Sequence, residues 1–418
     1  MEIGTAILII GFAALAAAFI LLLIGLVYSE VMNSEIPPGI ANSGKLHTVH
    51  GCLVGIAVLG QILARLGLCS EVGFSRWFTE LVIGKPQPIS PGLRIKDMTF
   101  GGVPVRVYEP TAPSDQKRRG MMYFHGGGWI LGSINMHDNI CRQIAKESNT
   151  TVASVGYRLA PEHRFPAHLD DCEAATLHFF SVAEAEFGVD PHRVVLGGDS
   201  AGGNLSAALS QRLAKKWTGD VPSPLALVLI YPALQMADFT LPSYLQNQSV
   251  PLLYRARMVF YYLHYLNGDV SVCQDVLAGR HIPAELKAHY SKWLDPANLP
   301  PEFRERSYQK HEQEDTAHDG EVYHVIKDGL QSEFSPLLAE DDVLRLTPST
   351  FILTCEYDVL RDDGILFHKR LKDLGVDVTW HHVSDGFHGI VSFFNMGWLT
   401  FPAGKRAMDQ IVSYIKTL

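Results

Sequence analysis

The chain has 418 residues, of which 47% are hydrophobic and 19% charged, and its formal net charge is −9 at pH 7. This length and apolar content allow a large buried core, which excludes a disordered protein. The charges are spread along the chain without a basic stripe, so the electrostatic footprint that nucleic-acid binding requires is missing. We therefore expect a folded protein without a nucleic-acid partner.

The cysteines and histidines favour neither a disulfide scaffold nor a metal site. The six cysteines are scattered and include no CxxC pair. The sequence does not show which cysteines would pair, so a single disulfide bridge is left undecided. The eighteen histidines, including His163, His168, His381 and His382, lack a ligand spacing such as HExxH. We expect no metal ion and no cofactor.

The first residues form an apolar segment. Thr5 to Tyr28 is a run of about 24 residues without a charge, long enough as a helix to cross the roughly 30 Å of bilayer hydrocarbon. A cleavable signal peptide usually has a shorter apolar stretch, preceded by positive charge, whereas Glu2 precedes this run. We interpret residues 1–29 as an uncleaved transmembrane anchor, with a signal peptide or a buried core helix as alternatives.

Residues 30–91 are interpreted as a linker that also contributes to a cap. They contain an apolar stretch from Cys52 to Leu68 that Gln61 and Arg65 interrupt. A charge in the middle of a membrane is costly, so this stretch predicts an amphipathic helix and not a second span.

From residue 92 to residue 418 the pattern is that of an α/β domain. Ile95–Phe100 and Val103–Tyr108, joined by two glycines, predict an antiparallel hairpin at the edge of a sheet. Further short apolar runs alternate with helical patterns, at Met121–Phe124, Val152–Tyr157, Val194–Gly197, Leu225–Tyr231, Phe351–Thr354 and Val376–His382. This alternation predicts a mostly parallel sheet with helices on both faces.

The interval between Tyr231 and Phe351 is too long for one crossover helix. Its first part is rich in aromatic residues, namely Tyr254, Phe260, Tyr261, Tyr262, Tyr265 and Trp293. We interpret residues 236–345 as a helical cap insertion over the substrate site, with extra core as the alternative.

The strongest motif is Gly-Asp-Ser-Ala-Gly at residues 198–202. It follows a predicted strand and precedes the helical run Asn204–Lys215. A sharp strand-to-helix turn exposes the serine hydroxyl at the carboxyl edge of the sheet, and small neighbours are needed because the turn is strained. A chance GxSxG in a glycine-rich loop is the alternative, which this context disfavours. Ser200 is therefore the candidate nucleophile.

A second motif, His-Gly-Gly-Gly-Trp, occupies residues 125–129 after a short strand. Glycines let backbone N–H groups approach a ligand closely, so this loop and the N–H of Ala201 are expected to bind the oxyanion of a tetrahedral intermediate. Each such donor typically contributes about 3 kcal/mol of transition-state stabilisation. Alone, the glycine run could be a flexible turn.

A serine nucleophile needs a base and an orienting acid. In α/β enzymes with a GxSxG turn, the acid and then the histidine follow the serine along the chain. Asp358 follows the strand Phe351–Thr354, and His388 follows the strand ending at His382. We predict these two as partners of Ser200. The rival acids are Asp362, Asp363 and Asp385, and the rival bases are His381 and His382.

Five ordered motifs together resemble the hormone-sensitive-lipase-like branch of the α/β-hydrolases. They are residues 125–129, Tyr-Arg-Leu-Ala-Pro-Glu at 157–162, residues 198–203, Tyr-Asp-Val-Leu-Arg-Asp at 357–362, and Asp-Gly-Phe-His-Gly at 385–389. The anchor, Tyr-Pro-Ala-Leu at 231–234 and Leu-Pro-Ser-Tyr at 241–244 make the chain similar to the arylacetamide deacetylase family. The resemblance covers most of the chain from about residue 95 onward.

This resemblance implies an α/β-hydrolase fold with Ser200, Asp358 and His388 as catalytic triad. It also implies that Gly126, Gly127 and Ala201 donate to the oxyanion, and that a cap covers an apolar acyl pocket.

The expected reaction is hydrolysis of a small apolar carboxylic ester through an acyl-enzyme, without a cofactor. An amide deacetylase and a catalytically silent lipid-binding homologue are the alternatives, and a purely structural membrane protein is disfavoured because no triad residue is missing.

The resemblance further implies a single-pass type II protein of the endoplasmic reticulum with a lumenal catalytic domain. Sequons at Asn149 and Asn247 agree with a lumenal position, and both asparagines are expected to be exposed and glycosylated. A third sequon at Asn204 lies on the helix after Ser200 and is interpreted as a chance match. The flanking charges do not decide the orientation.

Overall fold

The computed structural model describes the chain apart from residues 1, 35, 86–90, 115, 217–221 and 305–317. One sheet has eight strands in the order β1-β2-β4-β3-β5-β6-β7-β8. The strands are β1 Leu93–Phe100, β2 Val103–Pro110, β3 Arg118–Phe124, β4 Thr151–Val155, β5 Val189–Asp199, β6 Ala226–Ile230, β7 Ser349–Tyr357 and β8 Val378–Phe387.

The sheet is antiparallel at one edge and parallel elsewhere. β1 pairs with β2 and β2 with β4 in antiparallel fashion, whereas the pairs from β4 through β3 to β8 are parallel. Gly101 and Gly102, which join β1 to β2, have φ values of 56° and 86°, a conformation that favours glycine in a tight turn. The predicted edge hairpin and the mostly parallel sheet are confirmed.

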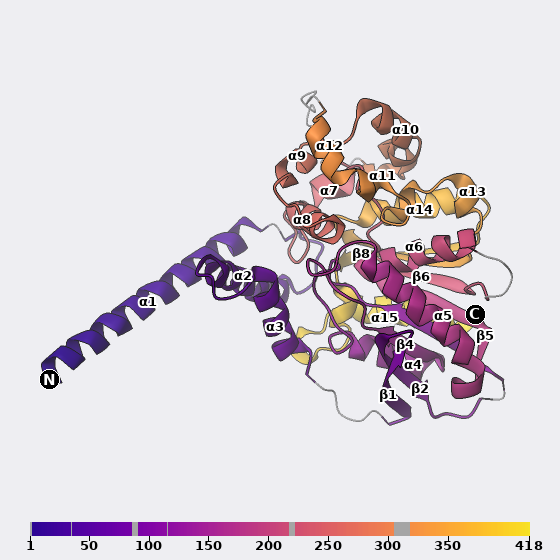
Figure 1. Ribbon diagram of the computed structural model, residues 1–418, viewed down its shortest axis with the longest axis horizontal. Coiled ribbons are helices and arrows are strands. Elements are labelled where there is room, and N and C mark those ends of the chain that lie inside the picture. Colours follow the sequence, from indigo (N-terminus) through magenta and orange to yellow (C-terminus); the bar gives the residue numbers. More distant parts are fainter. Residues whose placement is uncertain (1, 35, 86–90, 115, 217–221, 305–317) are drawn as a thin grey trace.

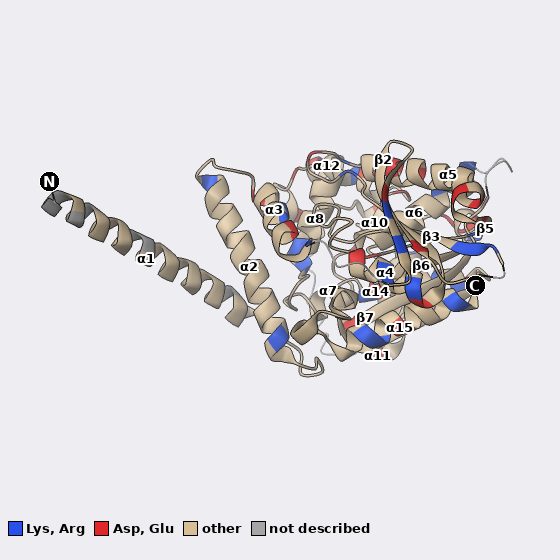
Figure 2. Cartoon of the chain, turned by 90° about the horizontal axis from the view of Figure 1, so that it is seen from below, with Lys and Arg blue, Asp and Glu red and all other residues tan. Residues whose placement is uncertain are grey.

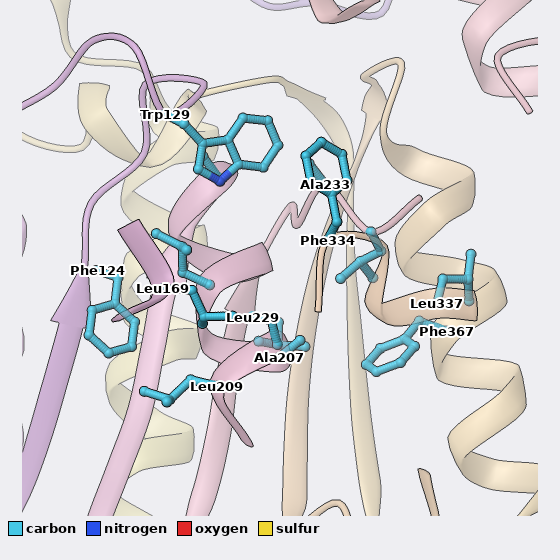
Figure 3. Close-up of a cluster of buried hydrophobic side chains, with 14 of the residues drawn as sticks. Phe124, Trp129, Leu169, Ala207, Leu209, Leu229, Ala233, Phe334, Leu337 and Phe367 are labelled. Carbon is cyan, nitrogen blue, oxygen red and sulfur yellow. The ribbon is translucent and has the colours of Figure 1, made fainter. Parts of the chain in front are cut away.

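Helices cover both faces of the sheet (Figure 1). Five of them pack directly on it: α4 Asp138–Ser148, α5 Ala167–Phe187, α6 Ala201–Lys216, α14 Arg361–Asp373 and α15 Pro402–Thr417. Side chains alternate between the faces, so that Met122 and Phe124 of β3 enter one core and Met121 and Tyr123 the other. Figure 3 shows part of the first core, where Phe124, Leu209 and Leu229 lie beneath Trp129.

A group of short helices connects β6 to β7. They are α7 Pro242–Gln246, α8 Arg255–Leu266, α9 Cys273–Leu277, α10 Ala284–Leu294, α11 Pro301–Arg304, α12 Gly320–Ile326 and α13 Asp341–Leu344. Figure 1 shows α7 to α12 gathered at one end of the α/β body. Tyr262 and Tyr265 of α8 are fully buried in the core cluster that also contains Trp129, so this region packs onto the body.

Three helices precede the sheet: α1 Glu2–Asn33, α2 Ser43–Arg65 and α3 Glu71–Ile83. α1 projects away from the body, and its described side chains include none of Asp, Glu, Lys or Arg (Figure 2). Both α1 and α2 are long and apolar enough to cross a membrane. The helix predicted over Cys52–Leu68 starts earlier, at Ser43, and Gly67 with φ 71° follows its end.

Candidate active site

Ser200 lies in a strained turn between β5 and α6. Its φ is +56°, which is unfavourable for a residue other than glycine, and its N–H donates to Ile230 O at 2.8 Å. A Cβ atom on Gly198 or Gly202 would lie 2.1 or 1.8 Å from Phe124 O. The turn therefore requires glycine on both sides of the serine, which is the physical basis of the GxSxG pattern.

Ser200, His388 and Asp358 form one hydrogen-bonded chain. His388 Nε2 lies 2.9 Å from Ser200 Oγ, and His388 Nδ1 lies 2.8 Å from Asp358 Oδ2. Asp358 follows the end of β7, and His388 follows the end of β8. Because parallel strands end at the same edge of a sheet, residues about 190 positions apart in sequence meet there. This geometry suits proton transfer from serine to histidine.

β8 is longer than predicted. It continues through Val383 to Phe387, with an irregular register opposite Cys355 and Tyr357, instead of ending at His382. His388 is consequently held at the end of a strand and not in a long loop.

The rival acids have other partners. Asp385 binds Arg406 Nη2 at 2.6 Å, and Asp362 binds Arg361 Nε at 2.9 Å. Asp363 accepts the N–H of Leu234 at 2.9 Å.

The rival bases lie in β8. His382 Nε2 lies 2.9 Å from Glu356 Oε2, and its Nδ1 lies 3.0 Å from Thr354 Oγ1. Both ring nitrogens of His382 are thus engaged away from Ser200.

Gly126 does not offer its N–H to the oxyanion site, which corrects one of the sequence-based expectations. Its N–H donates to Asp199 Oδ1 at 2.9 Å, and a Cβ on it would lie 2.3 Å from Asp199 Oδ2. In the part of the chain that the structure describes, the N–H groups of Gly127, Gly128 and Ala201 donate to no protein acceptor. Gly128 was missed because sequence alone does not show that the aspartate before the serine takes the first N–H of the loop.

Asp199 is the centre of a buried polar cluster behind this loop. Tyr123 Oη donates to Asp199 Oδ1 at 2.7 Å, and His137 Nε2 lies 3.5 Å from the same atom. Burial would raise the pKa of Asp199, but the charge of His137 and these hydrogen bonds bring the pKa down to about 2. Burial likewise opposes the charged form of His137, yet Asp199 leaves the pKa of His137 raised. The two residues form a buried ion pair.

His125 supports the loop as a neutral ring. Burial, together with the neighbouring His137, lowers the pKa of His125 to about 3. The ring stacks on Tyr157 at a centroid distance of 4.3 Å, and Tyr157 Oη donates to His125 O at 2.6 Å. No hydrogen bond joins either side chain to Ser200, whose Oγ is bonded to His388, so we interpret both as scaffold.

Aromatic residues of α8 cover the glycine loop. Trp129, with φ 61°, stacks on Tyr265 at a centroid distance of 4.4 Å. A Cβ on Gly128 would lie 2.5 Å from Tyr261 Cδ2, so the Tyr261 ring lies directly against this glycine. The space beside the oxyanion loop is therefore bounded by the segment between β6 and β7.

The two sequons have different surroundings. Asn149 is half-buried at the C-terminal end of α4, where its Oδ1 accepts from Arg118 Nε at 3.4 Å. Asn247 is only 3% exposed, and its Nδ2 donates to Asp358 O at 3.0 Å. The expectation that Asn247 is exposed and glycosylated is wrong for this conformation, because the amide nitrogen that would carry the glycan is buried and bonded.

Comparison with known proteins agrees with this fold. A family described as alpha/beta hydrolase fold matches residues 121–281 and 294–392. The solved structure titled hyperthermophilic esterase from the archeon Pyrobaculum calidifontis matches with a TM-score of 0.61 and 28% identity, covering 86% of this chain and 97% of that chain.

Two curated proteins match nearly the whole chain. Arylacetamide deacetylase-like 3 of Mus musculus is 40% identical over 94% of this chain and 95% of its own length. Neutral cholesterol ester hydrolase 1 of Rattus norvegicus is 38% identical over 92% of this chain and 94% of its own length.

Proposed function

Because the chain belongs to the α/β-hydrolase family, and within it to arylacetamide deacetylase and its like proteins, we propose that it is a membrane-anchored serine hydrolase that cleaves carboxylic esters of apolar acyl groups. The observation that carries the proposal is the position of His388, within 2.9 Å of Ser200 Oγ and 2.8 Å of Asp358 Oδ2. No cofactor enters the mechanism.

In the first step, His388 Nε2 takes the proton of Ser200 as Oγ attacks the acyl carbonyl carbon. Asp358 accepts from Nδ1 and so keeps the ring in the required orientation. Collapse of the tetrahedral intermediate breaks the bond to the leaving alcohol, which receives the proton from His388. The acyl group stays on Ser200 as an ester.

The oxyanion of each tetrahedral intermediate is bound by the N–H groups of Gly127, Gly128 and Ala201. These donors face no protein acceptor among the described residues, so they are available without reorganisation. Water then attacks the acyl-enzyme with His388 as base, and the carboxylic acid leaves.

An apolar substrate fits the aromatic surroundings of the glycine loop, where Tyr261 and Trp129 lie. The names of the relatives include both an ester hydrolase and a deacetylase, so an amide is the second candidate substrate. It differs chiefly in its demand for protonation of the leaving nitrogen by His388.

Membrane attachment through α1 is the second part of the proposal. α1 is an apolar helix whose candidate span, Ile9–Ser29, has a mean hydropathy of 2.8. A type II orientation in the endoplasmic reticulum places the body in the lumen, where Asn149 is the sequon that we expect to carry a glycan.

Covalent labelling tests the chemistry. A fluorophosphonate probe should label the wild-type chain in membranes, and Ser200→Ala should abolish both labelling and hydrolysis of p-nitrophenyl acetate. Labelling of the Ser200→Ala variant would overturn the proposal. Comparison of an ester with the matching anilide then separates esterase from deacetylase.

A further inference from the structure

One side of α3 is hydrogen-bonded to the segment that directly follows the glycine loop of residues 125–129. Arg76 Nε donates to Ile130 O at 2.5 Å. One turn later, Glu80 accepts from Ser133 Oγ at 2.7 Å and from Asn135 Nδ2 at 2.6 Å. Residues four apart lie on the same side of a helix, so these contacts set which side of α3 faces the protein.

The opposite side of α3 is apolar and exposed. Trp77, Leu81 and Val82 are 60%, 55% and 53% exposed. The remaining charged residue of α3, Glu71, lies 3.9 Å from Arg257 Nη1 of α8. All three charged side chains of α3 therefore contact polar groups of the protein, and the exposed side of the helix has no charged side chain.

α3 also packs against the N-terminal helices, because α3 contacts α2 and α2 contacts α1. A Cβ on Gly51 of α2 would lie 3.4 Å from Val31 Cγ2 of α1, and one on Gly55 would lie 3.7 Å from Val27 Cγ2. These are ordinary van der Waals distances, so α2 packs against α1 along this stretch. α3 in turn packs on α2, where the Phe74 ring lies near Gly60.

We propose that the exposed side of α3 lies in the interface of the same phospholipid bilayer that α1 crosses, and that lipid-dissolved esters reach Ser200 past α3. This proposal rests on the membrane attachment proposed above. Trp77 suits such a position, because tryptophan is enriched at the boundary between headgroups and acyl chains. α3 is bonded to the segment that follows the glycine loop, so its uncharged side gives an apolar substrate a path from the lipid toward Ser200.

Tryptophan quenching tests the position of α3. The full chain is reconstituted in phosphatidylcholine vesicles with or without brominated acyl chains, and wild type is compared with Trp77→Phe. The fluorescence that Trp77 contributes should be strongly quenched by the bromines. Equal quenching of both proteins would overturn the proposal, as would shielding of Trp77 by a second copy of the chain.

Activity tests the route. A variant with Leu81→Ser and Val82→Ser should hydrolyse a long-chain ester dissolved in the vesicles about tenfold more slowly, with hydrolysis of p-nitrophenyl acetate unchanged. Leu346, which is 60% exposed and lies just before β7, provides the control Leu346→Ser. Equal loss on both esters, or an unchanged vesicle rate, would overturn the proposal.

Failure of the proposed function is distinguishable from these outcomes. A wild-type chain that does not float with the vesicles would refute the anchor, and one that does not cleave p-nitrophenyl acetate would refute the hydrolase. Neither result depends on α3.

An independent observation concerns Asn247, directly after α7. Its Nδ2 donates to Asp358 O at 3.0 Å and to Glu356 O at 3.3 Å. From the start of the same helix, Ser243 Oγ donates to Val359 O at 2.7 Å. Both ends of α7 are therefore bonded to the main chain on either side of the acid that faces His388.

We infer that Asn247 is a positioning residue, which holds the turn of Asp358 in line with His388 and connects the first helix after β6 to the triad. The inference rests on the triad of the proposed function. Its amide is the only group of Asn247 that reaches these carbonyls, so a side chain of the same shape without N–H donors would release the turn.

The test is Asn247→Asp, which keeps the shape and replaces both donors with acceptors. We expect kcat for p-nitrophenyl acetate to fall about 100-fold with KM within about twofold, because a small displacement of a catalytic group acts on the chemical step. Ser243→Ala, which loses one bond to the turn, should show a smaller loss of the same kind.

Ser249→Ala is the matched control, because it destroys the sequon and leaves the Asn247 amide in place. It should keep full activity. An equal loss in Ser249→Ala would show that a glycan matters and the hydrogen bonds do not, and an unchanged kcat in Asn247→Asp would overturn the inference. If Ser200→Ala were fully active, the proposed triad itself would fail instead.

Discussion

The carboxylate of Asp199 accepts the N–H of Gly126 at 2.9 Å, so the residue before the proposed nucleophile Ser200 holds the first glycine of the proposed oxyanion loop. One ionised side chain thereby joins two motifs that are about 75 residues apart in sequence. His137 and Tyr123 share the same oxygen atom and keep it charged. The glycine loop and the turn of Ser200 are thus positioned by a common group.

Asp199→Asn should lower kcat about 100-fold for a short ester, because the neutral amide loses the ion pair and loosens the loop that presents Gly127 and Gly128. Steady-state kinetics with p-nitrophenyl acetate measures the effect. Labelling by fluorophosphonate should persist at a reduced rate, since Ser200 and His388 are intact. Wild-type kcat in this variant would show that the loop holds its position without Asp199.

Asp358→Asn should lower kcat about 10⁴-fold, because the amide no longer favours the histidine tautomer that accepts the Ser200 proton. Asp385→Asn is the matched control near the carboxyl end of β8, since Asp385 binds the exposed Arg406. Its kcat should stay within about twofold of wild type. The reverse ranking would mean that Asp385 is the acid of the triad.

The ion pair of Asp199 and His137 should make stability depend on pH. The pKa of His137 is raised in the folded chain, so the pair stabilises fully below the ordinary value of 6.5 and its contribution is lost as pH rises through the raised pKa. His137→Gln should therefore cost about 3 kcal/mol at pH 6 and less at pH 9. Urea unfolding in detergent at both values measures this, and a cost that grows with pH would contradict it.

Much of the fold could be predicted because its patterns are local. Each of the eight strands overlaps a segment that the sequence predicts as a strand, and the two glycines between the first two strands specify a tight turn. The positions of Ser200, Asp358 and His388 follow from the rule that functional side chains come after the carboxyl ends of parallel strands.

What sequence could not supply were contacts between distant segments. The Gly126 N–H was assigned to the oxyanion because nothing local shows that Asp199 takes it. Asn247 was expected to be exposed because it follows a proline-containing stretch, whereas α7 turns it inward to the carbonyl of Asp358. Both errors concern hydrogen bonds across more than 70 residues, which no local pattern encodes.

The two adjacent tyrosines of α8 should behave differently when replaced by serine. Tyr261 lies against Gly128, so Tyr261→Ser should raise KM for long-chain esters more than for acetate esters while the fold is kept. Tyr262 is fully buried, with its ring 5.1 Å from that of Trp129, so Tyr262→Ser should leave a cavity and cost about 3 kcal/mol of stability. Kinetics on a series of p-nitrophenyl esters and thermal unfolding of both variants separate the effects. If Tyr261→Ser changed KM equally for all chain lengths, the proposed role of α8 in covering the acyl site would be wrong.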